Sequence, residues 1–222
     1  MKQKKLNLMT SNHLKTKRNY LERMNNSKVK CMKEAKKYNR NYWDGHRKYG
    51  YGGYRFIEGR WTKVAKKIIN IFKLKNDSKI LDVGCGKAFL LYEIKKLLPQ
   101  IKVAGFDISK YAIDKAPKNI KKNLFVHKAE EKYPFKKNYF DLALSTGCFH
   151  NLEINQLKFA INEIQRVSKK NYIMVESYRN EEELFNLQCW ALTCESFFSE
   201  KEWKWLFKQF NYKGHFEFIY FQ

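Results

Sequence analysis

Ile80-Leu81-Asp82-Val83-Gly84-Cys85-Gly86-Lys87-Ala88-Phe89-Leu90 is the stretch of this sequence that decides the fold. An apolar run ends in an acid and opens into a turn interrupted by glycines, which predicts a buried parallel strand that leads into a helix. Gly84 and Gly86 can adopt backbone angles that a side chain would forbid, so a ligand can lie against the main chain beside the helix N-terminus. Nucleotide-type cofactors bind at turns of this kind.

A second predicted strand, residues 101–106, ends at Asp107 about twenty residues beyond the turn, where a carboxylate can accept hydrogen bonds from both hydroxyls of a ribose. A nucleoside is therefore the expected ligand. The dinucleotide fingerprint G-x-G-x-x-G would place a third glycine at position 89, but this chain has Phe89. The sequence therefore disfavours a hydride-transfer enzyme.

The pattern resembles the first motif of class I S-adenosylmethionine-dependent methyltransferases, acid-x-Gly-x-Gly-x-Gly, with Ala88 at the third glycine. Residues 127–130 are similar to the adenine-binding turn of that family, residues 139–144 to its fourth strand, and residues 145–152 to the segment that faces the transferable methyl group. A helix is predicted near 154–167, a fifth strand at 172–176, and a helix followed by alternating aromatic strands over 203–221. The resemblance covers roughly residues 62–222. It implies an α/β fold with a doubly wound, Rossmann-like sheet, preceded over residues 1–61 by a basic arm and a lid rich in aromatic residues and glycine.

The resemblance also implies a site. The cofactor is expected to be S-adenosylmethionine, with S-adenosylhomocysteine as product, and its predicted contacts are Asp82, Gly84, Cys85, Gly86, Asp107, Ile108, Ala129, Glu130 and Ser145. His150 is the leading general base, with Glu176 and His46 as alternatives. A purely structural role for His150 is to cap the following helix. No carboxylate cluster resembles the metal site of catechol-type relatives, so we expect no metal.

Two segments are predicted to hold the acceptor. Residues 42–61 combine glycines with aromatic side chains, which suits a loop that closes over a ligand, although they also suit a pad that packs the arm on the core. Arg179, just beyond the fifth predicted strand, can clamp a carboxylate, phosphate or diphosphate, or form a surface ion pair with Glu181 to Glu183. The expected acceptor is a small anionic molecule, and its predicted contacts are His46, Arg47, Tyr49, Tyr54, Arg60, Glu176, Tyr178 and Arg179.

The composition of the chain limits the other classes of function that it could have. The formal net charge is +23, and residues 1–60 carry 17 basic and four acidic side chains. Such charge is typical of proteins that bind nucleic acid. However, Lys far outnumbers Arg, whereas phosphate and base contacts favour Arg, so we expect no specific nucleic-acid partner. Five cysteines without C-x-x-C spacing indicate reduced thiols, and no apolar membrane span or secretory signal is evident, so we expect a cytoplasmic protein.

The chain is identified as a member of the small-molecule methyltransferases. Residues 42–45 and 175–180 also resemble members that accompany bacterial capsule or lipopolysaccharide clusters, which implies O-methylation of an activated sugar or a phosphorylated precursor. One alternative is an RNA-directed methyltransferase that uses the basic arm, although the tetrapeptide typical of base-amino methylating enzymes does not follow the fourth strand. The other alternative is a cofactor-binding module that does not catalyse, which the intact Gly84, Gly86 and Asp107 disfavour.

Overall fold

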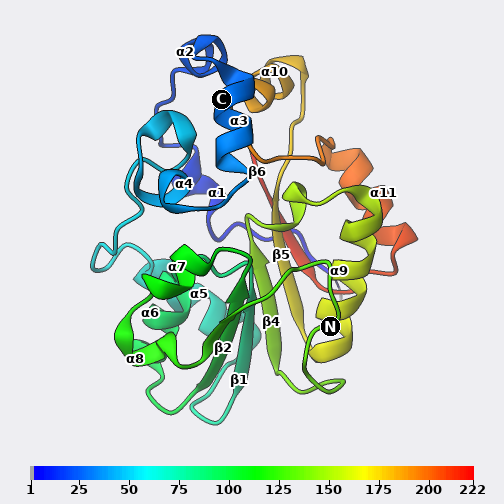
Figure 1. Ribbon diagram of the computed structural model, residues 1–222. Helices are drawn as coiled ribbons and strands as arrows, with labels where there is room; N and C mark the ends of the chain where they lie inside the picture. Colours follow the sequence, from blue (N-terminus) through cyan, green and yellow to red (C-terminus); the bar gives the residue numbers. More distant parts are fainter. Residues whose placement is uncertain (1–2) are drawn as a thin grey trace.

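A computed structural model describes residues 3–222, and its centre is a six-stranded sheet of order β3-β2-β1-β4-β5-β6 (Figure 1). Every neighbouring pair of these strands is parallel. The chain enters at the centre, runs outward to β3, returns to β4 and runs outward again, so the predicted doubly wound α/β fold is confirmed. The strands are β1 (Lys79–Val83), β2 (Lys102–Asp107), β3 (Leu124–Val126), β4 (Leu142–Thr146), β5 (Asn171–Glu176) and β6 (His215–Ile219).

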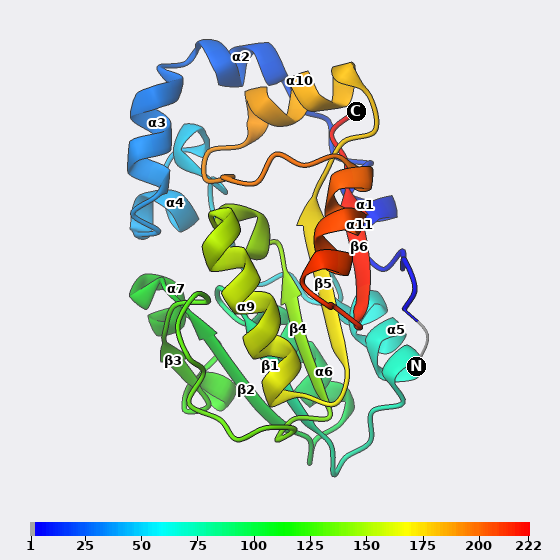
Figure 2. The same ribbon diagram turned by 90° about the vertical axis from the view of Figure 1, so that its right-hand side faces the viewer.

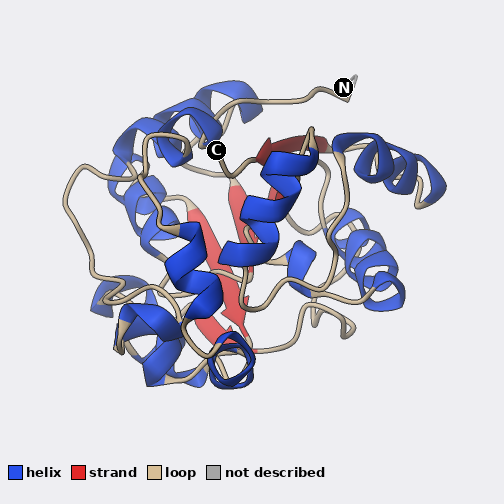
Figure 3. Cartoon of the chain, turned by 90° about the horizontal axis from the view of Figure 1, so that it is seen from above, coloured by secondary structure: helices blue, strands red, loops and turns tan. Residues whose placement is uncertain are grey.

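Helices cover both faces of the sheet (Figures 2 and 3). Adjacent residues of β1 point to opposite sides, because Ile80 packs in the hydrophobic cluster under α5 and α6 whereas Leu81 packs in the cluster under α9 and α11. The helices over the two faces and the two short helices between β2 and β3 are α5 (Thr62–Phe72), α6 (Phe89–Leu97), α7 (Lys110–Asp114), α8 (Lys118–Lys121), α9 (Ile154–Val167) and α11 (Glu200–Gln209). The helices predicted near 154–167 and at the start of 203–221 are confirmed, and the aromatic strands predicted after the second helix are one strand, β6.

The N-terminal segment, residues 3–10, lies along the edge strand β6. Lys5 forms a parallel bridge with Phe216, and the fully buried carboxylate of Glu217 accepts hydrogen bonds from the backbone N–H groups of Leu8, Met9 and Thr10 at 2.7–2.8 Å. A buried charge needs such partners, and here the start of the chain supplies them. The N-terminal segment is therefore part of the packed structure.

A third layer lies beyond the carboxyl ends of the strands, at the top of Figure 1. The rings of Tyr20 and Trp190 meet edge to face there, with centroids 6.0 Å apart, and so join the arm to the segment after β5. Among residues 3–222, no helix is both long and apolar enough to cross a membrane. The elements of this layer are α1 (Thr10–His13), α2 (Tyr20–Asn25), α3 (Lys28–Ala35), α4 (Arg40–Asp44), η1 (Arg47–Tyr49), η2 (Phe149–Asn151) and α10 (Glu181–Trp190).

Candidate active site

The turn between β1 and α6 has the backbone shape that its sequence predicts. Gly84 and Gly86 both have positive φ, +74° and +54°, and Ala88, at the third motif position, also has φ +57°. A β-carbon on Gly84 would lie 2.5 Å from the side chain of Cys148, which no real structure tolerates. Gly84 is therefore required both by its backbone angle and by the close approach of the loop after β4.

Two buried acids flank this turn. Asp82, 2% exposed, has an Oδ1 atom with no hydrogen-bond partner among residues 3–222, and burial together with the nearby Asp107 raises its pKa to about 8. Asp107 accepts hydrogen bonds from the N–H groups of Gly86 and Ser109, each at 2.8 Å. Burial raises the pKa of Asp107 to about 6 in spite of these two bonds. An unsatisfied buried oxygen at a glycine turn is a position where a cationic ligand group would be stabilised.

The aromatic loop, residues 42–54, covers the turn. The Trp43 indole N–H donates to the Ser109 hydroxyl at 2.8 Å, and a β-carbon on Gly86 would lie 2.7 Å from the Trp43 ring. Trp43 is buried and stacks on Tyr51 with centroids 5.2 Å apart. The loop therefore packs the arm on the core, as one interpretation of the sequence expected, and it also closes over the glycine turn.

A buried ion pair fastens the loop to the turn. Lys87 Nζ lies 2.7 Å from both carboxylate oxygens of Asp44 and also donates to the Tyr54 carbonyl at 2.7 Å. The Lys87 side chain is 5% exposed and that of Asp44 is 24% exposed. Burial opposes the charge on Asp44, but hydrogen bonds from Lys87 and Tyr111 outweigh it and lower the pKa of Asp44. We call this pair, Asp44 and Lys87, the latch.

His150 and Glu176 form a pair at the ends of β4 and β5. The Glu176 backbone N–H donates to His150 Nδ1 at 3.2 Å, and His150 Nε2 lies 3.5 Å from Glu176 Oε2. Because Nδ1 is the acceptor, the proton of the neutral ring is on Nε2 and faces the carboxylate. Burial lowers the pKa of His150, although the Glu176 charge opposes this. The expectation that His150 caps the next helix is wrong, because Glu153 and Gln156 form the capping box of α9.

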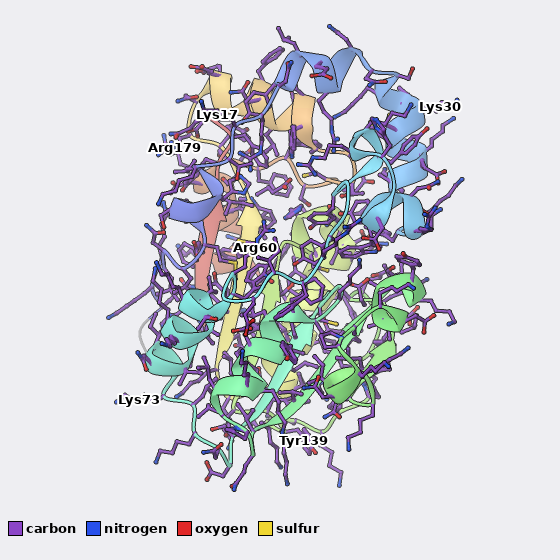
Figure 4. The ribbon with its side chains drawn as sticks, turned by 90° about the vertical axis from the view of Figure 1, so that its left-hand side faces the viewer. Lys17, Lys30, Arg60, Lys73, Tyr139 and Arg179 are labelled. Atoms are coloured by element: carbon purple, nitrogen blue, oxygen red, sulfur yellow. The ribbon has the colours of Figure 1, made fainter. Side chains whose placement is uncertain are left out.

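A cavity of about 610 Å³ connects these features. Its lining includes the glycine turn, Glu176, His150 and residues of the upper layer. Four of the predicted cofactor contacts and four of the predicted acceptor contacts line it, together with His150: Asp82, Gly84, Cys85, Gly86, Arg47, Tyr54, Arg60 and Glu176. Figure 4 shows Arg60 in the segment that leads into α5, on the side where the sheet meets the upper layer.

The other predicted cofactor contacts do not line the cavity. Asp107 lies behind Gly86, with Trp43 and Ser109 closing that end. Ile108 is 44% exposed, Ser145 is fully buried in β4, and the turn with Ala129 and Glu130 is held by a bond of 3.0 Å from the Tyr133 hydroxyl to the Ala129 carbonyl. For the nucleoside end of a cofactor to reach Asp107, the aromatic loop has to move off Gly86.

The remaining predicted acceptor contacts lie elsewhere as well. Arg179, labelled in Figure 4, is paired with Glu183 and stacks on Tyr220, with its guanidinium carbon 4.2 Å from the ring centroid. The ion pair expected as its alternative role is therefore present. The hydroxyl of Tyr178 lies 3.4 Å from the Glu202 carboxylate. His46 accepts a hydrogen bond from the Lys48 N–H, and neither His46 nor Tyr49 lines the cavity.

Sequence reasoning missed several residues that do line the cavity, above all Arg18 and Arg23. The sequence does contain a signal that could have identified these arginines. Only eight of the 45 basic residues are Arg, and six of these eight lie in residues 1–60. In a chain that uses Lys for most of its exposed charge, Arg at particular positions marks sites where the shape of the guanidinium matters.

Comparison with known proteins agrees with this geometry. A family described as "Methyltransferase domain" matches residues 74–211. The arginine-hydroxylase NDUFAF5 of Danio rerio, a mitochondrial protein, is 31% identical over 109 residues, which are 49% of this chain and 33% of that protein. The demethylmenaquinone methyltransferase of Thermotoga maritima is 25% identical over 112 residues, 50% of this chain and 48% of that enzyme.

Among solved structures, the YcgJ protein from Bacillus subtilis superposes with a TM-score of 0.53 at 18% identity, over 66% of each chain. At that identity the likeness establishes the shared fold. The chain spans between about a third and a half of the length of the two curated relatives.

Proposed function

The chain belongs to the methyltransferase-domain family, and on this premise we propose that it transfers a methyl group from S-adenosylmethionine to a small molecule bound in the cavity beyond the carboxyl ends of β1, β4 and β5. The observation that carries the proposal is the juxtaposition at one cavity of a glycine turn with positive φ, an unpartnered buried carboxylate oxygen on Asp82, and the Glu176–His150 pair.

The residues present suit the cofactor. Asp82 Oδ1 is free to accept a hydrogen bond from an ammonium group, and Arg60 lines the same cavity, where it can pair with a carboxylate. Gly84 and Gly86 leave the main chain open to a ligand. Asp107 is the acceptor for ribose hydroxyls once the aromatic loop shifts, because each carboxylate oxygen keeps a lone pair beyond the bond it already accepts. When bound, S-adenosylmethionine supplies an electrophilic methyl group on a sulfonium.

Glu176 is the general base in this proposal and His150 positions it. The proton on His150 Nε2 faces the Glu176 carboxylate, so the imidazole acts as a donor in this arrangement and has no free lone pair for an acceptor proton. The Glu176 side chain is 17% exposed and lines the cavity, whereas that of His150 is 5% exposed. Glu176 can therefore take the proton from an acceptor hydroxyl, and the rest of catalysis is alignment of the acceptor with the methyl group.

Transfer of label from methyl-tritiated S-adenosylmethionine to a small-molecule extract of cells that express the protein tests this assignment. The parent protein should transfer label. Glu176→Gln should reduce the transfer by about 10²- to 10⁴-fold. The affinity of this variant for S-adenosylhomocysteine should stay within about twofold of the parent's. His150→Gln, which keeps a donor toward Glu176, should retain more activity than His150→Ala and shift the pH profile less. Full activity in Glu176→Gln would place the base elsewhere.

The narrower acceptor class stays a prediction. O-methylation of an activated sugar or a phosphorylated precursor of a bacterial surface polysaccharide is supported by the cluster of arginines in the cavity, which favours an anionic acceptor. The names of the two curated relatives refer to other substrates, arginine and demethylmenaquinone. The RNA-directed alternative would instead rely on the exposed lysines of the arm, whereas Arg18, Arg23 and Arg47, whose guanidinium groups suit phosphate better, line the cavity.

A further inference from the structure

Three arginines of the arm converge on one tryptophan ring in the cavity. The guanidinium carbons of Arg18, Arg23 and Arg47 lie 5.4, 4.7 and 5.0 Å from the centroid of Trp190. Trp190 ends α10, and the arginines come from the chain between α1 and η1, so the cluster spans the interface between α2 and α10 (Figure 1). All four residues line the cavity that reaches Glu176 and the glycine turn.

Within residues 3–222, none of the three arginines has a carboxylate within ion-pair distance. Their hydrogen bonds go to neutral groups: Arg18 donates to the Thr16 carbonyl at 2.9 Å, Arg23 to the Trp190 carbonyl at 3.3 Å, and Arg47 to the Gly50 carbonyl at 2.7 Å. The Nε atom of Arg18 is buried and has no partner in the described part of the chain. Arg18 and Arg23 are half-buried, whereas Arg47 is exposed at the rim. Because an unpaired buried donor on a cation is costly, an anion that reached Arg18 Nε would stabilise the cluster.

Mutual repulsion adds to that cost. Burial and, to a smaller extent, the charge of Arg47 lower the pKa of Arg23 to about 10. Lys28, which donates to the carbonyls of Cys189 and Ala191 beside this cluster, has a pKa lowered to about 8 by burial and then by Arg23. Cation–π attraction to Trp190 offsets part of the repulsion, but a single ring cannot neutralise three charges.

We propose that Arg18, Arg23 and Arg47, set around Trp190, form a subsite for a phosphate or diphosphate group of the methyl acceptor. The net charge favours this chemistry. Three guanidinium groups and one nearby carboxylate, Glu176, leave a net positive charge that a ligand with two or more negative charges would neutralise. The planar donor forks of Arg suit tetrahedral phosphate oxygens. The inference rests on the proposed function because it assigns the bound group to the methyl acceptor. The subsite itself is defined by the arginine cluster alone.

The shared cavity gives the subsite a role. The glycine turn, the Glu176–His150 pair and the arginine cluster all line this one cavity. A phosphate held at Trp190 would anchor the acceptor and direct the remainder of the molecule toward the Glu176 carboxylate. Binding energy from a remote group of this kind orients the reacting atom.

Titration calorimetry on the full chain at constant ionic strength tests the inference, with inorganic phosphate, pyrophosphate and acetate as probes, in the absence and presence of S-adenosylhomocysteine. Phosphate or pyrophosphate should bind, acetate should bind at least tenfold more weakly (about 1.4 kcal/mol), and Arg23→Gln should weaken the binding by about 10- to 100-fold. Arg23→Lys should fall between, because it keeps the charge and loses the fork. Arg40→Gln, the same change at an exposed residue outside the cavity, is the control and should leave binding unchanged.

The outcomes separate the two proposals. Phosphate and pyrophosphate affinities that are equal in the parent and in folded Arg23→Gln and Arg23→Lys would overturn the subsite, while binding of S-adenosylhomocysteine would still support the proposed function. If Arg23→Gln instead lost its affinity for S-adenosylhomocysteine, the arginines would belong to the cofactor site and the inference would also fail. A stronger response to pyrophosphate than to phosphate would identify the diphosphate as the group recognised, and the reverse order would identify the phosphate monoester.

Discussion

Replacement of Gly84 by alanine probes the packing of the glycine turn against the loop after β4. Gly84 has φ +74°, and an added β-carbon would lie 2.5 Å from both Cβ and Sγ of Cys148. A left-handed backbone costs an L-residue about 1–2 kcal/mol, and forcing an extra methyl into a packed site costs about 1–3 kcal/mol. Gly84→Ala should therefore lower the free energy of unfolding by about 2–5 kcal/mol, measured by urea denaturation.

Two glycines of the same chain separate the backbone cost from the steric cost. Gly59, φ +77°, has nothing within 4 Å of an added β-carbon, and Gly147, also φ +77°, would meet only Met174 at 3.7 Å. Each alanine variant should cost about 1 kcal/mol, because restriction of the unfolded chain offsets part of the backbone strain. If Gly84→Ala were no more destabilising than Gly59→Ala, the close approach to Cys148 would be refuted.

A double variant sharpens the test. Both clashing atoms belong to the Cys148 side chain, so Cys148→Gly removes them, whereas Cys148→Ala keeps the Cβ contact. Gly84→Ala combined with Cys148→Gly should be less destabilised than the sum of the single variants by about 1–3 kcal/mol. Additive costs would mean that the two residues do not touch.

Three further predictions concern the latch, the arm and pH. Lys87→Met leaves the Asp44 carboxylate without its cation, so unfolding should become easier by about 1–3 kcal/mol and amide exchange in the aromatic loop should become faster; unchanged exchange would mean that the latch does not hold the loop. Glu217→Gln puts an amide donor among several N–H and O–H donors, so the N-terminal segment should become sensitive to proteolysis while the parent resists. Burial raises the pKa of Asp82 to about 8, so its carboxyl is protonated at neutral pH. A bound ammonium group should lower that pKa. Binding of S-adenosylhomocysteine should therefore release a proton, and its affinity should increase as pH rises toward 8. Calorimetry in buffers of different ionisation enthalpy measures the release, and proton uptake would contradict the assignment.

Much of the fold could be predicted from local patterns. The strand and turn around Asp82 to Gly86, the amphipathic helix from Thr62 and the helix at 154–167 each carry their own periodicity and punctuation, so a short stretch of sequence decides their structure. The turn and Asp82 were predicted for the same reason, since the motif lies within one strand and its loop, and Asp107 was predicted because it ends the next strand.

The remainder of the site depends on contacts between distant segments. Lys87 stands at a variable position of the glycine motif, and only the packing of the arm brings it to Asp44, 43 residues away in the chain. Glu217 becomes a buried anchor because the N-terminal segment returns to β6, and Arg18 meets Trp190 because α2 packs on α10. The role expected of His150 as a base depends on a tautomer, which is set by the backbone N–H of Glu176 on a neighbouring strand.

Titration of S-adenosylhomocysteine into the protein and into Asp107→Asn tests the central claim most directly, namely that the glycine turn and its acids bind this cofactor. The asparagine keeps one of the two acceptor oxygens, turns an amide donor toward the other backbone N–H group, and loses the charge that strengthens hydrogen bonds to ribose hydroxyls. The parent should bind, Asp107→Asn should bind about 10- to 100-fold more weakly, corresponding to about 1.5–3 kcal/mol, and Asp114→Asn, the same change at a half-exposed residue of α7, should bind as the parent does. Equal affinity in Asp107→Asn and the parent, or no binding by the folded parent protein, would contradict the claim.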